Sequence, residues 1–267
     1  MARPTLIGIP YDASSSFLRG ASGAPPLIRQ ALFSSASNPW TERLIRTASD
    51  DVLDDEGDLV LPDGPEALPI IERSISALAS QGRPFVALGG DHFVTYPILR
   101  GLRPHHPSLT VLHIDAHPDL YDEFEGNRLS HACPFARIME ERLAERLVQV
   151  GIRAMTAHQR DQARRFDVEQ IDMRAWADGA RPSTSGPVYV SIDLDGIDPA
   201  FAPGVAHREP GGLSVREVLT VLDTLGGTLV GADVVELNPS QDLGGLTASV
   251  AGKLVKELAA HFIVETD

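Results

Sequence analysis

The sequence predicts an α/β fold in which helices cover both faces of a mostly parallel central sheet. Short apolar runs alternate along the chain with amphipathic segments, a pattern typical of strands joined by crossover helices. No internal repeat, low-complexity tract or linker-like change of composition interrupts this alternation. We therefore expect residues 1–267 to form a single domain.

Six apolar runs predict the buried strands of this sheet. Each run contains β-branched or aromatic residues and is bounded by Gly, Pro or polar residues. In chain order the runs cover residues 5–9, 84–88, 109–114, 148–152, 188–192 and 228–235.

Helices are predicted in the intervals between these runs. The segment that begins at Pro65 places Leu68, Ile71 and Ile75 on one face and ends near Gly82. Ser214 followed by Glu217 forms a capping-box pattern, which predicts a helix start. The predicted helices cover residues 25–31, 65–81, 96–102, 134–147, 157–166, 214–225 and 247–260.

The charge balance bears on the class of partner. The formal net charge is −14, and no cluster of Lys and Arg offsets it. Because such a surface repels a nucleic-acid backbone, we expect no nucleic-acid partner and favour a small cation or a metal ion. Residues 50–58 include six acids, which we interpret as a solvated surface without further function.

Cysteine usage and hydropathy bear on the location of the protein. Cys133 is the only cysteine, so no disulfide can form within the chain, which fits a reducing compartment. The first apolar run is shorter than a signal-peptide core, and no apolar segment approaches the roughly 18 residues of a membrane span. We therefore expect a cytoplasmic protein without a membrane partner.

Potential metal ligands follow the predicted strand at residues 109–114. Asp115, His117 and Asp119 are spaced two apart, so in an extended chain their side chains project to one side. Two carboxylates held close together repel each other and resist burial unless a cation lies between them. The alternative interpretation of this stretch alone is a solvated polar loop.

Other strands end in similar side chains. His92 follows a strand and two glycines, and Asp193 and Asp195 follow another strand. Since the carboxyl ends of parallel strands meet at one edge of a sheet, we expect these side chains to converge. One divalent ion would leave ligands unused, whereas two ions about 3.5–4 Å apart would use all six. Mostly oxygen ligands favour Mn²⁺ over Zn²⁺. The alternative is scattered acids that cap helices or bind water.

Three segments carry a resemblance to a known family. They are 89–92 (Gly-Gly-Asp-His), 115–119 (Asp-Ala-His-Pro-Asp) and 191–199 (Ser-Ile-Asp-Leu-Asp-Gly-Ile-Asp-Pro). In order and spacing they resemble the signature motifs of the ureohydrolases, which include arginases and agmatinases. Segments 15–20, 121–132, 201–207 and 231–239 are most similar to the plant-type arginase branch.

The resemblance implies an arginase-like three-layer α/β/α sandwich, a binuclear manganese site and a homo-oligomer, either a trimer or a hexamer. It places His92, Asp115, Asp119 and Asp193 on one ion. It places His117, Asp115, Asp193 and Asp195 on the other. It also implies that His131 shuttles protons and that Glu236 orients the guanidinium. These two residues and Asp119 are the predicted catalytic residues.

The implied reaction cleaves a guanidino C–N bond to give urea and an amine. Arginine is the favoured substrate, with agmatine as the alternative and a guanidino acid or formiminoglutamate as further ones. Animal-type arginases carry an acidic pair where this chain has Thr156 and Gln159, so the sequence leaves the far end of the substrate unassigned. A single-zinc deacetylase would lack the equivalents of His92 and Asp119. A non-catalytic binding protein with this fold is the remaining alternative.

Other polar residues near these motifs receive structural interpretations. His113 lies deeper in its strand and is interpreted as a hydrogen-bonded core residue. His207 lies in a Gly/Pro-rich loop near the site and is interpreted as a solvated loop histidine, with contact to the substrate as the alternative. Cys133 is interpreted as a packed residue. Asp91 and Asp198 are expected to shape turns or to orient ligating groups.

Overall fold

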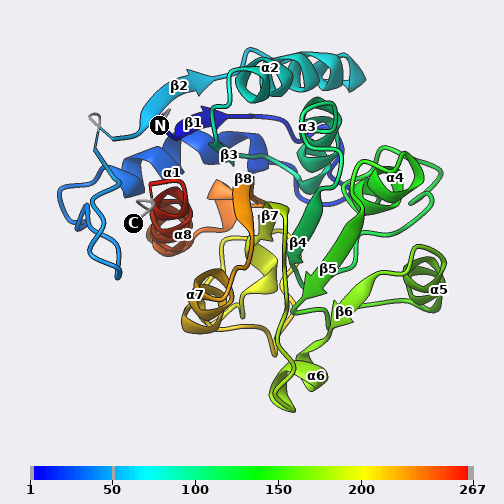
Figure 1. The fold of residues 1–267 in the computed structure, drawn as a ribbon. Helices are drawn as coiled ribbons and strands as arrows, with labels where there is room; N and C mark the ends of the chain where they lie inside the picture. The colour runs from blue at the N-terminus through cyan, green and yellow to red at the C-terminus, as the bar shows by residue number, and fades with distance from the viewer. Residues whose placement is uncertain (1–2, 50–51, 264–267) are drawn as a thin grey trace.

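An eight-stranded sheet runs through the centre of the computed structural model, which describes residues 3–49 and 52–263 (Figure 1). The strand order is β2-β1-β3-β8-β7-β4-β5-β6, and every strand pair is parallel. The strands are β1 (Thr5–Gly8), β2 (Asp54–Asp58), β3 (Phe85–Leu88), β4 (Thr110–Ile114), β5 (Arg146–Val150), β6 (Glu169–Ile171), β7 (Pro187–Asp193) and β8 (Thr228–Val235).

Helices cover both faces of the sheet, which completes the predicted three layers (Figure 1). The α-helices are α1 (Ala24–Leu32), α2 (Leu68–Ser80), α3 (Thr95–Leu102), α4 (Pro134–Glu140), α5 (Ala157–Arg165), α6 (Met173–Ala177), α7 (Val215–Asp223) and α8 (Leu246–His261). Short 3-10 helices are η1 (Ala21–Gly23), η2 (Pro65–Ala67), η3 (His92–Val94), η4 (Leu194–Gly196) and η5 (Pro239–Gln241).

Alternating side chains of the strands divide the core into two apolar clusters. On β4, Leu112 and Ile114 face a cluster that includes residues of α1, α6, α7 and α8. Val111, one residue away, faces the second cluster, which includes residues of α2, α3, α4 and α5. This alternation is the two-residue period of a strand buried on both faces. The fold class predicted from the sequence is therefore confirmed.

The acidic run is more than a solvated surface. Residues Asp54–Asp58 form the edge strand β2, whose Asp54 pairs with Thr5 of β1. Arginine side chains lie against these acids: Arg29 Nε is 2.9 Å from Asp55 Oδ2, and Arg83 Nη2 is 2.8 Å from Glu56 Oε1. Pairing with β1 and neutralisation by arginine explain how an acidic segment becomes a strand. Asp50 and Asp51 of the run lie outside the described residues.

Other differences from the predicted elements lie in the second half of the chain. The helix predicted for residues 134–147 ends at Glu140, and a left-handed residue, Arg142, turns the chain toward β5. The edge strand β6 and the helix α6 were not predicted, because β6 is short and largely polar and α6 has only five residues. Asp172 begins α6 by accepting hydrogen bonds from the backbone N–H groups of Arg174 and Ala175.

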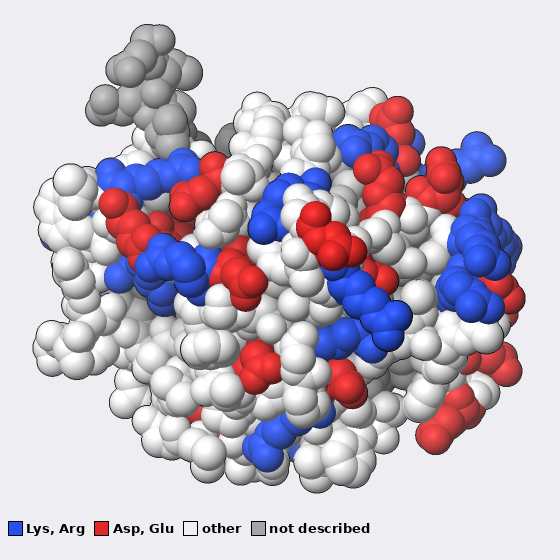
Figure 2. Space-filling view, turned by 90° about the horizontal axis from the view of Figure 1, so that it is seen from below, with Lys and Arg blue, Asp and Glu red and all other residues white. Residues whose placement is uncertain are grey.

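The surface carries both signs of charge. On the face shown in Figure 2, Lys and Arg side chains lie among Asp and Glu side chains, without an extended basic area in this view. Exposed ion pairs such as Arg216–Glu42 and Arg146–Glu169 belong to this mixed surface. Among the described residues, no helix has the length and apolar character needed to cross a membrane.

Candidate metal centre and active site

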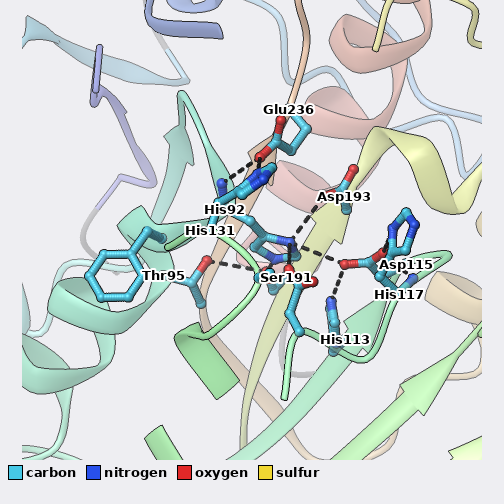
Figure 3. Close-up of polar contacts among 12 residues, drawn as sticks. His92, Thr95, His113, Asp115, His117, His131, Ser191, Asp193 and Glu236 are labelled. Carbon is cyan, nitrogen blue, oxygen red and sulfur yellow. Dashed lines mark hydrogen bonds and ion pairs between the residues drawn. The ribbon is translucent and has the colours of Figure 1, made fainter. Parts of the chain in front are cut away.

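The predicted site residues lie at the carboxyl ends of four adjacent strands. The strands β3, β8, β7 and β4 are neighbours in the sheet, and a predicted site residue ends or follows each of them. His92 begins η3 just after β3, Asp115 follows β4, Asp193 ends β7 and Glu236 follows β8. Figure 3 shows their side chains pointing toward one another.

His92 lies at the centre of a group of three carboxylates. Its Nδ1 atom is 3.1 Å from Asp115 Oδ2, 3.2 Å from Asp119 Oδ2 and 3.0 Å from Asp193 Oδ2. All four side chains are buried. Nδ1 has no conventional hydrogen-bond partner, while Nε2 lies 2.9 Å from Ser191 Oγ. A nitrogen surrounded by three carboxylate oxygens is a typical environment for a cation.

His117 forms a second group with two aspartate carboxylates. Its Nδ1 atom is 3.1 Å from Asp195 Oδ2 and 3.4 Å from Asp115 Oδ1. Asp115 therefore contacts both imidazoles, one through each carboxylate oxygen. Asp193 joins the two groups as well, since its Oδ1 accepts a hydrogen bond from the backbone N–H of Asp195.

The pKa values of this cluster indicate a deficit of positive charge. Burial and the neighbouring carboxylates raise the pKa of Asp193 well above its usual range and that of Asp195 to about 7. Burial opposes a charged imidazole, yet Asp195 and Asp115 raise the pKa of His117 to about 12, and the carboxylates around His92 raise its pKa too. The raised pKa values mean that this buried cluster binds protons to offset its negative charge. Divalent metal ions would offset the same charge, so these side chains fit a metal site.

A second pair of site residues borders the cluster. His131 Nδ1 lies 2.8 Å from Glu236 Oε1, and the same oxygen accepts a hydrogen bond from the backbone N–H of His92 at 2.9 Å. On the other side of the ring, His131 Nε2 lies 2.8 Å from Ser16 Oγ. Although burial opposes the charge, Glu236 raises the pKa of His131 to about 9, and His131 in turn lowers the pKa of Glu236.

A cavity of about 310 Å³ opens onto these groups. Four of the proposed metal ligands and the His131–Glu236 pair form one part of its lining. Aromatic, apolar and neutral polar side chains form the rest. The lining residues are Ser16, His117, Asp119, Tyr121, Phe124, His131, Ala132, Ala154, Met155, Thr156, Gln159, Asp193, Asp195, His207 and Glu236. Thr156 and Gln159 are joined by a capping box at the start of α5.

Two residues of the cavity wall were misread or missed in the sequence. His207, interpreted as a solvated loop residue, is half-buried, with its ring centroid 5.3 Å from that of His131. This interpretation was wrong because the loop folds over the strand ends. Ser16 lies in segment 15–20, which carries part of the family resemblance, but no role was predicted for it. The only signal was its position in a serine-rich loop after a strand, which cannot reveal the contact with His131.

The other interpretations of single residues agree with the structure. His113 is fully buried in β4, its Nε2 lies 2.8 Å from Asp115 Oδ2, and burial lowers its pKa. Burial raises the pKa of the Cys133 thiol to about 12, so it is an unreactive packed residue. Asp91 accepts hydrogen bonds from Phe93 N and from Ser14 N, and Asp198 accepts them in the loop after η4.

Comparisons with known proteins agree with the motifs. The model of the arginase family matches residues 2–261. The mitochondrial arginase 1 of Arabidopsis thaliana is 45% identical over 97% of this chain and 81% of its own length. The agmatinase of Bacillus anthracis is 32% identical over 97% of this chain and 91% of its own. The structure of the Medicago truncatula arginase matches with a TM-score of 0.91 and 41% identity over 97% of this chain and 87% of that one.

The same comparisons contradict the expected cytoplasmic location. Several of the similar plant arginases are named as mitochondrial or as chloroplastic and mitochondrial, so these relatives point to an organelle. The expectation failed because one cysteine and the lack of a membrane span do not distinguish the cytosol from the interior of an organelle. The predicted resemblance to ureohydrolases, and to plant arginases among them, is confirmed. The chain belongs to the arginase family.

Proposed function

We propose that this protein hydrolyses arginine to ornithine and urea at a site that holds two Mn²⁺ ions. The observation that carries the proposal is the convergence of six carboxylate and imidazole side chains at one site. Four of them line one cavity together with the His131–Glu236 pair. Members of the arginase family are metal-dependent hydrolases of small guanidino compounds, and similarity to plant arginases over almost the whole chain supports arginine.

The ligand sets that we propose share two aspartates. His92, Asp115, Asp119 and Asp193 would hold one ion, and His117, Asp115, Asp193 and Asp195 the other. The contacts of Asp115 with both imidazoles support its place between the ions. Four carboxylates and two imidazoles favour Mn²⁺. When bound, the ions would supply Lewis-acid activation of the attacking water.

Glu236 is proposed to hold the guanidinium of the substrate. Its Oε1 is occupied by His131 and the backbone of His92, whereas Oε2 has no hydrogen-bond partner among the described residues. Because the residue lines the cavity, this oxygen can accept charge-assisted hydrogen bonds from a planar cation. Asp119 also lines the cavity and can accept a hydrogen bond from the attacking water.

His131 is proposed to move the proton that the reaction requires. Water adds to the guanidino carbon, the bond to the chain nitrogen breaks, and the departing amine must gain a proton. Glu236 raises the pKa of His131, so the imidazole beside it on the cavity can carry that proton. Ser16 Oγ, at Nε2 of the ring, holds the imidazole from the other side.

Agmatine is the second candidate substrate, and one observation favours it. The lining of the cavity includes no Lys or Arg that could pair with the carboxylate of arginine. Agmatine has the same guanidinium and chain but no carboxylate, so it would leave no such charge unpaired. A relative named as an agmatinase supports the same alternative.

The experiment is to measure urea release from a panel of guanidino compounds after Mn²⁺ loading. The panel contains arginine, agmatine, a shorter guanidino acid and formiminoglutamate, whose amide product is assayed separately. We expect the highest kcat/KM with arginine. A higher kcat/KM with agmatine would transfer the proposal to that substrate, and the absence of hydrolysis across the panel would refute it.

The organisation of the whole protein is also a proposal. We propose that residues 1–267 act as one catalytic domain, which the single central sheet supports. From the family resemblance we further propose a trimer or a hexamer, which light scattering of the purified protein will test.

A further inference from the structure

A row of polar residues crosses the sheet beneath the proposed metal ligands, and all of its members are buried except the half-buried Gln170. Neighbouring strands β8, β7, β4, β5 and β6 are in register at these positions, each residue opposite the next. We call this set the polar row: Asp233, Ser191, His113, Gln149 and Gln170. Polar groups buried in a parallel sheet are costly unless they are hydrogen-bonded, so their partners carry information.

One end of the polar row contacts His92. Ser191 Oγ lies 2.9 Å from His92 Nε2 and donates to Asp233 Oδ1 at 2.7 Å. Asp233 also accepts hydrogen bonds from the hydroxyl groups of Thr95 and Tyr189. The contact of Thr95 with the row is visible in Figure 3. His113, the middle residue of the row, contacts Asp115.

The orientation of the Gln149 amide is fixed by its neighbours. Gln149 Nε2 lies 2.7 Å from the carbonyl oxygen of Pro118, which can only accept a hydrogen bond. On the other side, Gln149 Oε1 accepts from Gln170 Nε2 at 2.8 Å. An exchange of the amide nitrogen and oxygen would bring two oxygens together at Pro118. The amide nitrogen therefore faces both Pro118 and His113.

This orientation determines the tautomer of His113. Gln149 Nε2 lies 2.9 Å from His113 Nδ1, so Nδ1 must accept a hydrogen bond. A neutral imidazole has one N–H, which is then on Nε2, 2.8 Å from Asp115 Oδ2. The opposite tautomer would direct a lone pair at a carboxylate oxygen. His113 thus donates to Asp115, although its position beside His92 and Asp115 would also suit a metal ligand.

We propose that Gln149 is a positioning residue, which holds His113 as the Nε2–H tautomer and so orients the Asp115 carboxylate for metal binding. The inference rests on the proposed function, since it concerns a ligand of the proposed site. Partners that orient ligating groups are commonly worth 10–100-fold in metal affinity. Gln149 contacts neither the cavity nor a ligand directly, so its effect passes through His113.

The first test is the tautomer itself. In metal-free wild-type protein labelled with ¹⁵N at histidine, NMR should show His113 with its proton on Nε2. In Gln149→Glu, of nearly the same shape, the carboxylate can only accept, so the proton should move to Nδ1 or the ring should become charged. A wild-type His113 protonated on Nδ1 would overturn the proposal, whether or not the enzyme hydrolyses any guanidino compound.

The second test is metal affinity. Titration calorimetry with Mn²⁺ should show affinity at least about 10-fold weaker in Gln149→Glu and in Gln149→Leu than in the wild type. At saturating Mn²⁺, the kcat of both variants should return close to the wild-type value, although their affinity for Mn²⁺ stays weaker. The matched control is Gln162→Glu, a buried glutamine on α5 outside the cavity lining, which should leave Mn²⁺ affinity unchanged.

The outcomes separate this inference from the proposed function. Wild-type affinity in both Gln149 variants, with their fold intact by circular dichroism, would refute the positioning role. If the wild type binds Mn²⁺ but releases no urea, the proposed reaction fails while the role of Gln149 is still measured. If Gln149→Glu does not fold, Gln149→Leu and the wild-type tautomer decide the question.

Discussion

Two of the proposed catalytic residues have an unusual backbone conformation. Asp119 has φ of 51° and Glu236 has φ of 66°, the left-handed region that side chains other than glycine rarely adopt. Such residues cost about 1–3 kcal/mol each, a cost that the surrounding structure must offset. Here each lies just after a strand end and lines the cavity. The strain therefore lies where the carboxylates must be held in place before a ligand arrives.

The pKa of His131 gives a prediction at the same scale. Glu236 raises that pKa to about 9 despite burial, so Glu236→Gln should lower it toward the ordinary value of about 6.5. Titration of the imidazole by NMR in metal-free protein measures both values. The folded pKa of His131 lies above its unfolded value and that of Glu236 lies below its own, so the pair stabilises the fold fully between about pH 4.5 and about pH 6.5. This contribution is lost as the pH rises through about 9.

A matched control for this titration is the exposed pair of Arg216 and Glu42. Glu42→Gln removes a carboxylate far along the chain from the site and should leave the His131 titration unchanged. A His131 pKa that stays near 9 in Glu236→Gln would show that a group other than Glu236 raises the pKa of His131.

The positions of site residues could be predicted from the sequence where their spacing after a strand determined them. Parallel strand ends meet, so the convergence of Asp115 with His92 and Asp193 followed. The extended chain expected for residues 115–119 did not, since the chain bends at 116–117 and Asp119 is left-handed. Contacts between loops did not follow, because nothing in the local sequence specifies that Ser16 meets His131 across the site. The orientation of Gln149 was likewise beyond prediction, since it depends on three strands at once.

At the scale of elements, the segment after β1 holds one wall of the site. Asp12 accepts hydrogen bonds from Gly20 N at 2.7 Å, from Ser22 Oγ at 3.0 Å and from Arg19. Asp91 accepts from Ser14 N at 2.8 Å. These contacts tie residues 12–22 across the strand ends, and Ser16 lies within the segment. A loop thus acquires the rigidity that a catalytic wall requires.

Removal of this tie should have a measurable effect. Asp12→Ala leaves Gly20 N and Ser22 Oγ without their acceptor, so we expect a loss of about 2 kcal/mol in the free energy of unfolding. The pairing with Arg19 adds little, since that side chain is half exposed. Urea denaturation measures the change, and kcat should fall because Ser16 is no longer held against His131.

The control for Asp12→Ala is Asp161→Ala, which removes an exposed pair with Arg164. That change should stay within about 0.5 kcal/mol of the wild type. Equal stability of the two variants would mean that the segment is held by other contacts.

Elements were predicted well where burial dictated their pattern. The six central strands are mostly apolar and largely buried, and they were all located, with shifts of a residue or two at their ends. The edge strands β2 and β6 were missed because half-exposed strands need no apolar pattern, and β2 is almost entirely acidic. The predicted helix after Pro134 was too long. The helix ends at Glu140 and the chain turns at Arg142, whose left-handed conformation cannot be read from the residue type.

At the scale of the whole molecule, the order of the strands creates the site. The chain enters the sheet at β1, and the four strands that carry the site residues occupy neighbouring central positions although they are far apart in sequence. Their carboxyl ends place four acids and two imidazoles together, a charge arrangement that an apolar sheet could not bury alone. The net charge of −14 fits a protein whose ligands are cations.

The proposed function therefore requires that six side chains bind two metal ions. The direct measurement is the metal content of the purified protein after Mn²⁺ loading and removal of free metal, compared with Asp193→Ala. We predict two Mn²⁺ per chain in the wild type and almost none in the variant, since Asp193 is proposed to contact both ions. His131→Ala should keep both ions and lose turnover. One ion per chain in the wild type, or two ions retained by Asp193→Ala, would contradict the account.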